Sequence, residues 1–446
     1  MQAVTIVMKD TNLSAWLKYH GADEGFESEA VLAPTPTHEV FWDLIDGNPR
    51  REAWSSLEIW YNVPDPLRNA GALLDYFLFA TDYYQCYEPV DQVFACLGMV
   101  KRSLQRSHGQ ALPMHANYTK SVVEVYTEAM TFILSSTGCL TPLLRSRTSG
   151  RWQCELPSWV PNFEAYGWKD LLGKDLTDAK RVQNPRYVPY NASRDAVVGF
   201  GIRGTLLLVH HHPYATVTHV GELWNEITRG FRFERTAELM LARLKKLPSV
   251  GARIRDLLTT ICWSSIHSPD LERDSSSEMW AAFRAFVTLL TACWISTSRR
   301  HGRDHATILS QLKWQRYLAE LNETATIPLP ATIFVEVERD HDGYIRGLGR
   351  QKQLFEQTAH KTSPGRRVFL LDNGELGLGQ ENLRAGDVLY IVADGGRCPV
   401  LLRRKESQYR SSWSWIGEAS VDGIMYGEAV TQMDRESEIW QEAIII

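Results

Sequence analysis

Two hairpin signals in the C-terminal part of this chain restrict its fold more than any other feature of the sequence. The apolar runs Val368–Leu371 and Glu375–Leu378 flank Asn373-Gly374, a pair that favours the positive φ angles of a tight turn. A second pair of apolar runs, within 387–403, flanks Asp394-Gly395-Gly396 in the same way. Because short turns of this kind join antiparallel strands, we expect a small antiparallel β module of about four to six strands here.

Before this module the sequence shows the periodicity of helices. The clearest helix is predicted to begin after Ser121, whose side chain caps it while Glu124 reaches back to the cap. Apolar residues then recur at spacings of three and four along one stripe, and Gly138 is the expected end. A second capping box, Ser275 with Glu278, opens a helix that is apolar over most of its circumference, so we expect it to be buried.

Short β-branched runs separated by glycines predict two strands within the helical region, near residues 197–220. The predicted fold class is therefore α+β: a mainly helical body, interrupted by this strand pair, and a C-terminal antiparallel β module. The expected division of the chain is an N-terminal extension, the helical body and the β module, at residues 1–37, 38–330 and 331–446.

The charge balance argues against two classes of partner. The chain has 48 Lys and Arg against 53 Asp and Glu, a net charge of −5, whereas nucleic acids and anionic lipid surfaces are bound by basic faces. The seven cysteines are scattered without a Cys-x-x-Cys pair, which is typical of reduced, buried thiols. The N-terminus lacks the basic region of a signal peptide, and no apolar stretch is expected to approach the length of a membrane span. We therefore expect a cytoplasmic protein with no nucleic-acid and no membrane partner; its oligomeric state stays open.

Two motifs that look like ligand sites are better explained as parts of strands. Gly199–Gly204 matches the string G-x-G-x-x-G, but a strand pattern follows it where a dinucleotide site requires a helix. In His210–His212 adjacent side chains point to opposite faces of a strand, and Pro213 is expected to end that strand. No nearby Asp, Glu or Cys completes a set of metal ligands. The sequence thus predicts neither a cofactor nor a metal.

The candidate site residues lie in two long loops rich in aromatic side chains. Around Asp82–Asp91 carboxylates and phenols cluster, and such groups are suited to general acid–base catalysis; equally, Asp91 fits the N-cap of a following helix. The segment 152–168 is rich in Trp and Pro. If the chain has a pocket, we expect it between these loops, since binding residues concentrate in loops on a rigid scaffold. The candidates are Asp91 and Tyr84 for catalysis, and Trp159 and Tyr166 for substrate binding.

Several motifs in a fixed order resemble segments of fungal heterokaryon-incompatibility (HET) proteins. Residues 88–98 resemble that family's D-P-R-D-K-I-Y-A-L-L-G segment, residues 117–126 its D-Y-S-K-S-V-E-E-V-Y segment, and Leu156–Pro161 its L-P-S-W-V-P-D-W segment. Near the other end, glycine-containing motifs between Gly365 and Ala429 follow the order and spacing of the family's C-terminal β module. The resemblance covers most of the chain, and the ordered set of motifs is specific.

Members of this family usually begin with a Toll/interleukin-receptor-like α/β domain that carries motifs such as L-S-Y-V-W-G, and these motifs do not occur here. The resemblance therefore implies that this chain corresponds to the region C-terminal to that domain. One implied function is a HET-like accessory or self-recognition protein without catalytic activity, which binds a protein partner. The alternative is a cofactor-independent enzyme of cyclase or isomerase type, in which some of the 15 Trp, 17 Tyr and 15 Phe line a pocket for a small apolar secondary metabolite.

The residues that carry the C-terminal resemblance are expected to be architectural. Gly377, Gly423 and Gly427 lie where strands are predicted to turn, and Asp387 follows Gly386 at the start of a strand. Glycine is the default residue where the backbone takes a positive φ angle. We therefore expect these positions to fix the shape of the backbone rather than to bind a ligand.

Overall fold

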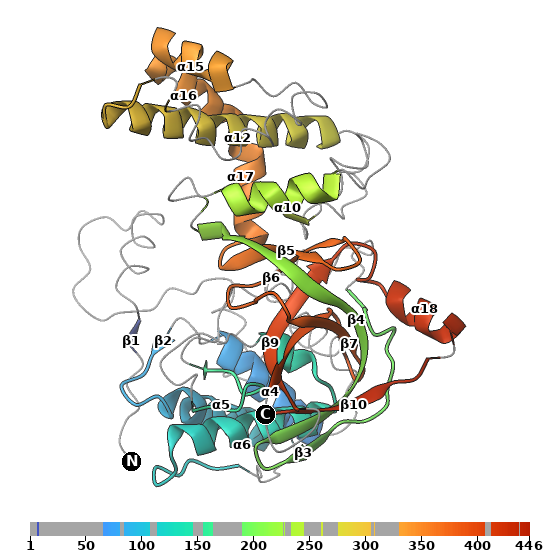
Figure 1. Ribbon diagram of the computed structural model, residues 1–446. Coiled ribbons are helices and arrows are strands. Elements are labelled where there is room, and N and C mark those ends of the chain that lie inside the picture. Colours follow the sequence, from blue (N-terminus) through green and yellow to red (C-terminus); the bar gives the residue numbers. More distant parts are fainter. Residues whose placement is uncertain are drawn as a thin grey trace, which may run out of the picture.

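The computed structural model describes residues 7–8, 66–80, 84–107, 114–145, 155–163, 190–225, 227, 233–244, 260–261, 275–304, 307, 330–405, 412–436 and 438–446. Helices lie at the two ends of the molecule, and a barrel of strands lies between them (Figure 1). The helices are α4 (Pro66–Ala80), α5 (Asp91–Ser107), α6 (Val122–Thr137), the 3-10 helix η1 (Thr141–Arg145), α10 (Glu234–Leu244), α12 (Ser275–Arg300), α15 (Pro330–Arg339), α16 (His341–Gln351), α17 (Gln353–Thr362) and α18 (Glu428–Glu436). The strands are β1 (Val7–Met8), β2 (Tyr84–Gln85), β3 (Gly201–Arg203), β4 (Leu206–Leu223), β5 (Arg366–Leu371), β6 (Leu376–Gln380), β7 (Val388–Val392), β8 (Val400–Lys405), β9 (Ser412–Val421) and β10 (Gln441–Ile445).

Six antiparallel strands close into a barrel. They form a circuit in the order β4, β5, β6, β9, β8, β7 and back to β4, and β3 and β10 pair with the first part of β4. Side chains alternate across the wall with the two-residue period of a strand. Phe369, Leu389 and Leu401 belong to the inner core and are fully buried, whereas their neighbours Leu370 and Tyr390 belong to outer clusters. The interior of the barrel is therefore filled by side chains, as in other small barrels.

The long strands β4 and β9 each change partner midway, and this leaves an opening in the barrel wall. At their first ends both pair with β10, through Leu207–His211 of β4 and Ser412–Trp413 of β9. At their other ends both pair with the β5–β6 hairpin. Val217–Leu223 of β4 pairs with β5, and residues 419–421 of β9 pair with β6. α18 lies over the opening between these two sets of pairings (Figure 1), and its buried face packs into the barrel core.

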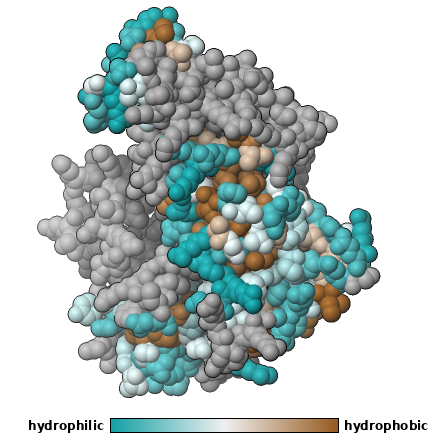
Figure 2. Space-filling view, in the orientation of Figure 1, coloured by the Kyte–Doolittle hydropathy of each residue, from teal (hydrophilic) through white to brown (hydrophobic). Residues whose placement is uncertain are grey.

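Helices cover the outer face of the barrel at both ends, because many outward-facing side chains of the strands are also apolar. α4, α5 and α6 pack on one another and on the outer faces of β4, β7 and β10. At the other end α10 and α17 cover β5 and β6, and α12 lies on α17, with α15 and α16 beyond it (Figure 1). On the face shown in Figure 2, hydrophobic residues gather over the part of the barrel next to α10.

The helix predicted after Ser121 is confirmed, together with both of its ends. The Oγ atom of Ser121 accepts the N–H of Glu124 at 3.3 Å, and a carboxylate oxygen of Glu124 accepts the N–H of Ser121 at 2.8 Å, so the capping box is complete. α6 ends at Gly138, whose φ angle of 64° is left-handed. Six of the seven residues of the predicted stripe are buried and Val122 is half-buried; the six are Val125, Tyr126, Ala129, Met130, Ile133 and Leu134.

α12 is the helix that the sequence predicts to be buried. Within the described part of the chain it is also the one helix long and apolar enough to cross a membrane, judged by length and composition alone over Glu278–Arg300. The expectation that no apolar stretch approaches the length of a membrane span is therefore wrong for this segment, because single charged residues such as Arg284 leave its mean hydropathy high. Of the qualifying window, 67% is buried inside the protein. Because α12 packs against α15, α16 and α17, this burial is typical of a core helix.

The α+β class is confirmed, and both C-terminal hairpins are present as β5–β6 and β7–β8. The strands expected near 197–220 are β3 and β4, but β4 pairs within the barrel instead of interrupting a helical body. The barrel thus takes strands from both sides of residue 330. Hydrophobic periodicity reveals that a segment forms a strand, but not which strand it pairs with. Of the N-terminal extension over 1–37, the structure describes Val7–Met8, which pairs with β2.

The prediction for the first hairpin turn is wrong at Asn373. Gly374 has a φ angle of 88°, whereas Asn373 is not among the residues with a positive φ angle. The N–H of Leu371 bonds to the carbonyl of Glu375 at 2.9 Å, so three residues make the turn. A three-residue hairpin turn requires a positive φ angle only at its last position, whereas the predicted two-residue turn requires it at both.

Candidate functional site

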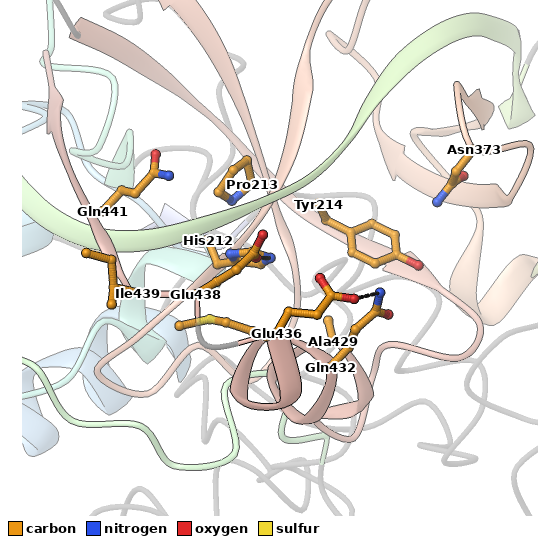
Figure 3. Close-up of a pocket in the computed structure, with 11 residues that line it drawn as sticks. His212, Pro213, Tyr214, Asn373, Ala429, Gln432, Glu436, Glu438, Ile439 and Gln441 are labelled. Carbon is orange, nitrogen blue, oxygen red and sulfur yellow. Dashed lines mark hydrogen bonds and ion pairs between the residues drawn. The ribbon is translucent and has the colours of Figure 1, made fainter.

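A cavity of about 680 Å³ lies at the opening in the barrel wall, between β4 and α18 (Figure 3). We call it the side groove. Its volume is within the range of pockets that hold small ligands or peptide side chains. β4 forms one wall and α18 the other, and the residues before β10 and the β5–β6 turn close the ends. The eleven lining residues are His212, Pro213, Tyr214, Asn373, Ala429, Gln432, Met433, Glu436, Glu438, Ile439 and Gln441.

β4 continues through Pro213, where the sequence predicts its end. The pairing of β4 with β7 shifts in register between Pro213 and Ala215, which marks a bulge with Tyr214 as the inserted residue. A proline is tolerated at a bulge because the ladder of hydrogen bonds is interrupted there. The bulge also changes the direction of the neighbouring side chains, and His212 and Tyr214 both line the side groove.

Tyr214 is held in the groove by a carboxylate from the β5–β6 turn. Its hydroxyl donates to an oxygen of Glu375 at 2.8 Å, and the Nδ2 atom of Asn373 donates to the same oxygen at 3.1 Å. Burial, followed by the hydrogen bond to Glu375, raises the pKa of Tyr214 well above its usual value of 10.0. Tyr214 is therefore a neutral hydrogen-bond donor at physiological pH, and its phenol is unsuited to act as a base.

Two further carboxylates give the groove an acidic character. Glu438 lies with an oxygen 3.3 Å from the Nε2 atom of His212, across the groove. Glu436 accepts a hydrogen bond of 2.9 Å from the side-chain amide of Gln432, and Figure 3 shows its carboxylate directed into the space below Tyr214. Among the lining residues His212 is the single one able to carry a positive charge. The groove is thus suited to bind hydrogen-bond donors and cations.

α18 is fixed over the barrel by the segment before β3. The NH1 atom of Arg194 lies 3.2 Å from the hydroxyl of Thr431 and 3.3 Å from a carboxylate oxygen of Asp434. Arg194 itself has a left-handed φ angle of 50°, which is uncommon for a residue with a side chain. Asn191 stabilises this turn, because its Oδ1 atom accepts the N–H of Asp195 at 2.9 Å. One wall of the groove therefore has a defined position.

The histidine triplet in β4 does not assemble a metal site with its neighbours. The Nδ1 atom of His210 lies 2.7 Å from the carbonyl of Gly199, while His212 faces Glu438. Within the described residues no group of three or more His, Cys, Asp or Glu side chains is placed to hold a metal ion.

The structure places the four residues singled out in the sequence as follows. Asp91 begins α5, and one of its oxygens accepts a hydrogen bond of 2.8 Å from the hydroxyl of Tyr118, which raises the pKa of that tyrosine. Trp159 is fully buried and donates from Nε1 to the carbonyl of Thr205 at 2.8 Å. The backbone of Tyr84 lies in β2, while its side chain and the whole of Tyr166 lie outside the described residues. Neither Asp91 nor Trp159 lines the side groove.

The described parts of the two predicted loops do lie close together. The hydroxyl of Tyr126 donates to the carbonyl of Pro89 at 3.0 Å, and the ring of the same tyrosine packs edge-on against Phe163 with centroids 5.0 Å apart. Pro89 belongs to the first loop and Phe163 to the second, and both contact α6. These contacts are core packing, so a catalytic or binding role for these loops stays a prediction.

Sequence reasoning missed the residues of the side groove because they come from four separate segments. One local signal was present: Pro213 stands inside a long β-branched run that continues on both sides of it. A proline at such a position indicates a bulge as readily as the end of a strand, and bulges are frequent beside functional sites. Nothing in the sequence indicates that α18 faces this bulge, because that contact depends on how the barrel closes.

His211, between His210 and His212, makes the stability of the fold sensitive to acid. It is 4% exposed, its ring packs edge-on against Tyr390 at 4.4 Å, and its Nδ1 atom has no hydrogen-bond partner in the described structure. Burial, and then the neighbouring His212 and His210, lower the pKa of His211 from 6.5 to about 4. In the unfolded chain this histidine takes up a proton near pH 6.5, whereas in the folded protein it stays neutral to about pH 4.

We therefore expect the stability to be complete above pH 6.5 and to fall as the pH is lowered towards 4, by up to about 3 kcal/mol from this group. Urea unfolding of the wild type and of His211→Gln, each measured at pH 7.5 and 4.5, checks this. The variant is expected to lose less stability between the two pH values than the wild type does. His219→Gln, in the same strand, serves as the control and is expected to behave as the wild type. Equal losses in all three proteins would contradict the assignment.

Comparison with known proteins identifies the barrel. Residues 349–440 match the family model described as the Het-6 β-barrel domain, a stretch that contains β5 to β9 and α18. The chain is also 36% identical over 72 residues to "Heterokaryon incompatibility protein 6, OR allele" of Neurospora crassa, a match that covers 16% of this chain and 10% of that relative. No solved structure matches the chain significantly. The resemblance of the sequence to heterokaryon-incompatibility proteins is thus confirmed by the match of its barrel segment and by this similarity, which spans about a tenth of the relative's length.

Proposed function

We propose that this chain is a recognition module in a process related to heterokaryon incompatibility, and that it acts by binding a protein partner rather than by catalysis. The observation that carries the proposal is the side groove. Most of its lining residues lie within the stretch that matches the Het-6 barrel, and β4 completes it from outside that stretch. A binding surface that belongs to the barrel of this family is a natural place for the recognition that incompatibility requires.

The way in which the groove is built supports binding. Because the barrel interior is filled by side chains, a ligand contacts the outside of the barrel. The polar groups of the groove are already oriented: Glu375 by Tyr214 and Asn373, and Glu436 by Gln432. Groups whose positions are fixed before binding lose little conformational entropy when a partner arrives.

The groove supports the enzymatic alternative less well. A cyclase or isomerase that acts on an apolar metabolite requires a largely apolar, aromatic wall. Among the described residues that line the groove Tyr214 is the one aromatic side chain, and Glu436 and Glu438 would be desolvated by an apolar ligand. A partner with polar or charged groups fits this surface better.

The test is genetic and uses the fungus that carries this gene. The gene is deleted and then restored as wild type, as the double variant Glu436→Gln/Glu438→Gln, or as the control Glu238→Gln/Glu381→Gln, in which two exposed carboxylates outside the groove and outside both predicted loops are changed. Each strain is confronted with a panel of isolates, and death of fused cells is scored by uptake of a vital dye. We expect the deletion to change the reaction with at least one isolate, and the wild type and control, but not the groove variant, to restore it. A deletion that leaves every confrontation unchanged would refute the proposed function.

A further inference from the structure

We infer that the side groove binds an extended, positively charged peptide segment of the partner, which adds a short strand to β4. The inference rests on the proposed function in that it names the kind of partner. Two independent features of the groove carry the inference: a gap in the pairing of β4, and the negative charge opposite that gap.

The first feature is a gap in the pairing of β4. His211 pairs with Val392 of β7 and with Gln441 of β10 at the same time, so β7 and β10 lie on opposite edges of β4. β5 also lies on the edge opposite β7, because both are neighbours of β4 in the closed barrel. β10 ends its pairing at His211 and β5 begins at Val217. On this edge, within the described strands, residues 212–215 therefore have no strand partner, and three of them line the side groove.

The length of this gap fits a short peptide. Four residues of a strand extend over about 13 Å, since each residue advances about 3.3 Å. An extended segment of four to six residues would occupy the edge between the end of β10 and the start of β5. Addition of a peptide strand to an open edge is a common way in which proteins bind extended segments, because main-chain hydrogen bonds give affinity whatever the peptide sequence. The side chains of the peptide then decide its specificity.

The second feature is the charge opposite this edge. α18 and the residues that follow it supply Glu436 and Glu438, while His212 already faces Glu438. Glu375 adds a third carboxylate behind Tyr214. A peptide strand in the gap would therefore direct alternate side chains towards carboxylates, and lysine or arginine side chains form charge-assisted hydrogen bonds with them.

The apolar residues of the groove fit the same side chains. Met433 and Ala429 lie on the α18 wall, and Ile439 lies at the rim with 77% of its surface exposed. The aliphatic parts of lysine and arginine side chains cover apolar surface of this kind while the charged ends remain at polar groups. An acidic peptide would place like charges together and is excluded by the same carboxylates.

The experiment measures binding of labelled peptides to the whole chain by fluorescence anisotropy. The probe is a six-residue peptide of alternating lysine and valine. The comparison peptides are one of alternating glutamate and valine, and the lysine–valine peptide with an N-methyl group on every backbone nitrogen, which removes the hydrogen-bond donors along both edges. Lysine methyl ester is used as a small cation without a strand. We expect only the unmodified lysine–valine peptide to bind, with an affinity that falls as salt is raised.

The groove carboxylates are tested with matched variants. Glu436→Gln/Glu438→Gln is expected to weaken binding roughly fivefold or more, since each exposed ion pair contributes modestly. Glu238→Gln/Glu381→Gln changes the net charge equally and is expected to leave the affinity unchanged. Circular dichroism of each variant checks that it is folded.

Several outcomes would overturn the inference: no binding of the lysine–valine peptide, equal binding of the acidic or the N-methylated peptide, equal binding of the small cation, or equal weakening by the two double variants. Such a result, found while cell death in the confrontations still depends on Glu436 and Glu438, would leave the proposed function intact with a different partner. Peptide binding through the groove without any effect of the gene on confrontations would support the inference and refute the proposed function.

Discussion

Replacement of Gly427 by valine is expected to destabilise the protein by about 2–6 kcal/mol. Gly427 has a φ angle of 93°, at which any residue with a side chain is strained. A Cβ atom at this position would also lie 1.9 Å from the Cγ atom of Arg194, far inside contact distance. Because Arg194 holds α18 through Thr431 and Asp434, its side chain is not free to move aside without loss of those bonds. Urea unfolding followed by circular dichroism measures the change.

Gly423 provides a matched control for the cause of this effect. Its φ angle of 88° is close to that of Gly427, but a Cβ atom there meets no atom within 4 Å. Gly423→Ala is therefore expected to lose stability through backbone strain alone. Gly427→Ala is expected to lose more, because the clash with Arg194 adds to the same strain. Equal losses in the two alanine variants would contradict the role of Arg194. Full stability of Gly427→Val together with loss of binding would indicate a direct role of this position in the site.

The second large effect is expected at a buried ion pair between β5 and β9. Arg366 and Glu418 are 2% and 0% exposed, and NH2 of the arginine lies 2.5 Å from Oε1 of the glutamate. The side-chain amide of Gln380 donates to the other oxygen of Glu418 at 2.6 Å. Glu418→Gln removes the negative charge that Arg366 faces in this pair, and loss of one partner of a buried pair costs about 3–5 kcal/mol.

Urea unfolding at neutral pH measures this loss, with Glu381→Gln as the control. Glu381 is an exposed carboxylate at the end of the neighbouring strand β6, and its replacement is expected to change the stability by less than about 0.5 kcal/mol. The double variant Arg366→Met/Glu418→Leu is expected to be more stable than Glu418→Gln, because it leaves no buried charge. A loss of less than about 1 kcal/mol in Glu418→Gln would show that the pair is not electrostatically isolated from water.

The parts of the fold that follow from local chemistry could be predicted from the sequence. The capping box of Ser121 and Glu124, and the two hairpins, depend on residues a few positions apart, and all of them are present. Pairing between distant segments could not be predicted in this way. β4 was recognised as a strand, but its partners β5, β7 and β10 lie far along the chain, and no local pattern specifies them.

The same limit applies to the site. Trp159 was a candidate because it stands in a proline-rich segment, but such segments also pack aromatic residues into a core, and the structure buries this one completely. The side groove depends on a bulge at Tyr214 meeting α18, which is a consequence of the closed barrel. Asp91 and Tyr84 stay predictions for catalysis, as do Trp159 and Tyr166 for substrate binding.

The pairing of β4 with β10, the last strand of the chain's described part, also constrains how the protein is made. Leu207 of β4 pairs with Ile445 of β10, roughly 240 residues later, so at a synthesis rate of about 5–20 residues per second β4 waits for its partner for roughly 10–50 s. During this time an apolar strand with open edges leaves the ribosome next to other nascent chains. Unpaired edges of this kind are templates for aggregation, and high contact order slows their closure after synthesis is complete. A growing chain of this protein is thus a substrate for chaperones that shield strands during translation, and its yield depends on their supply.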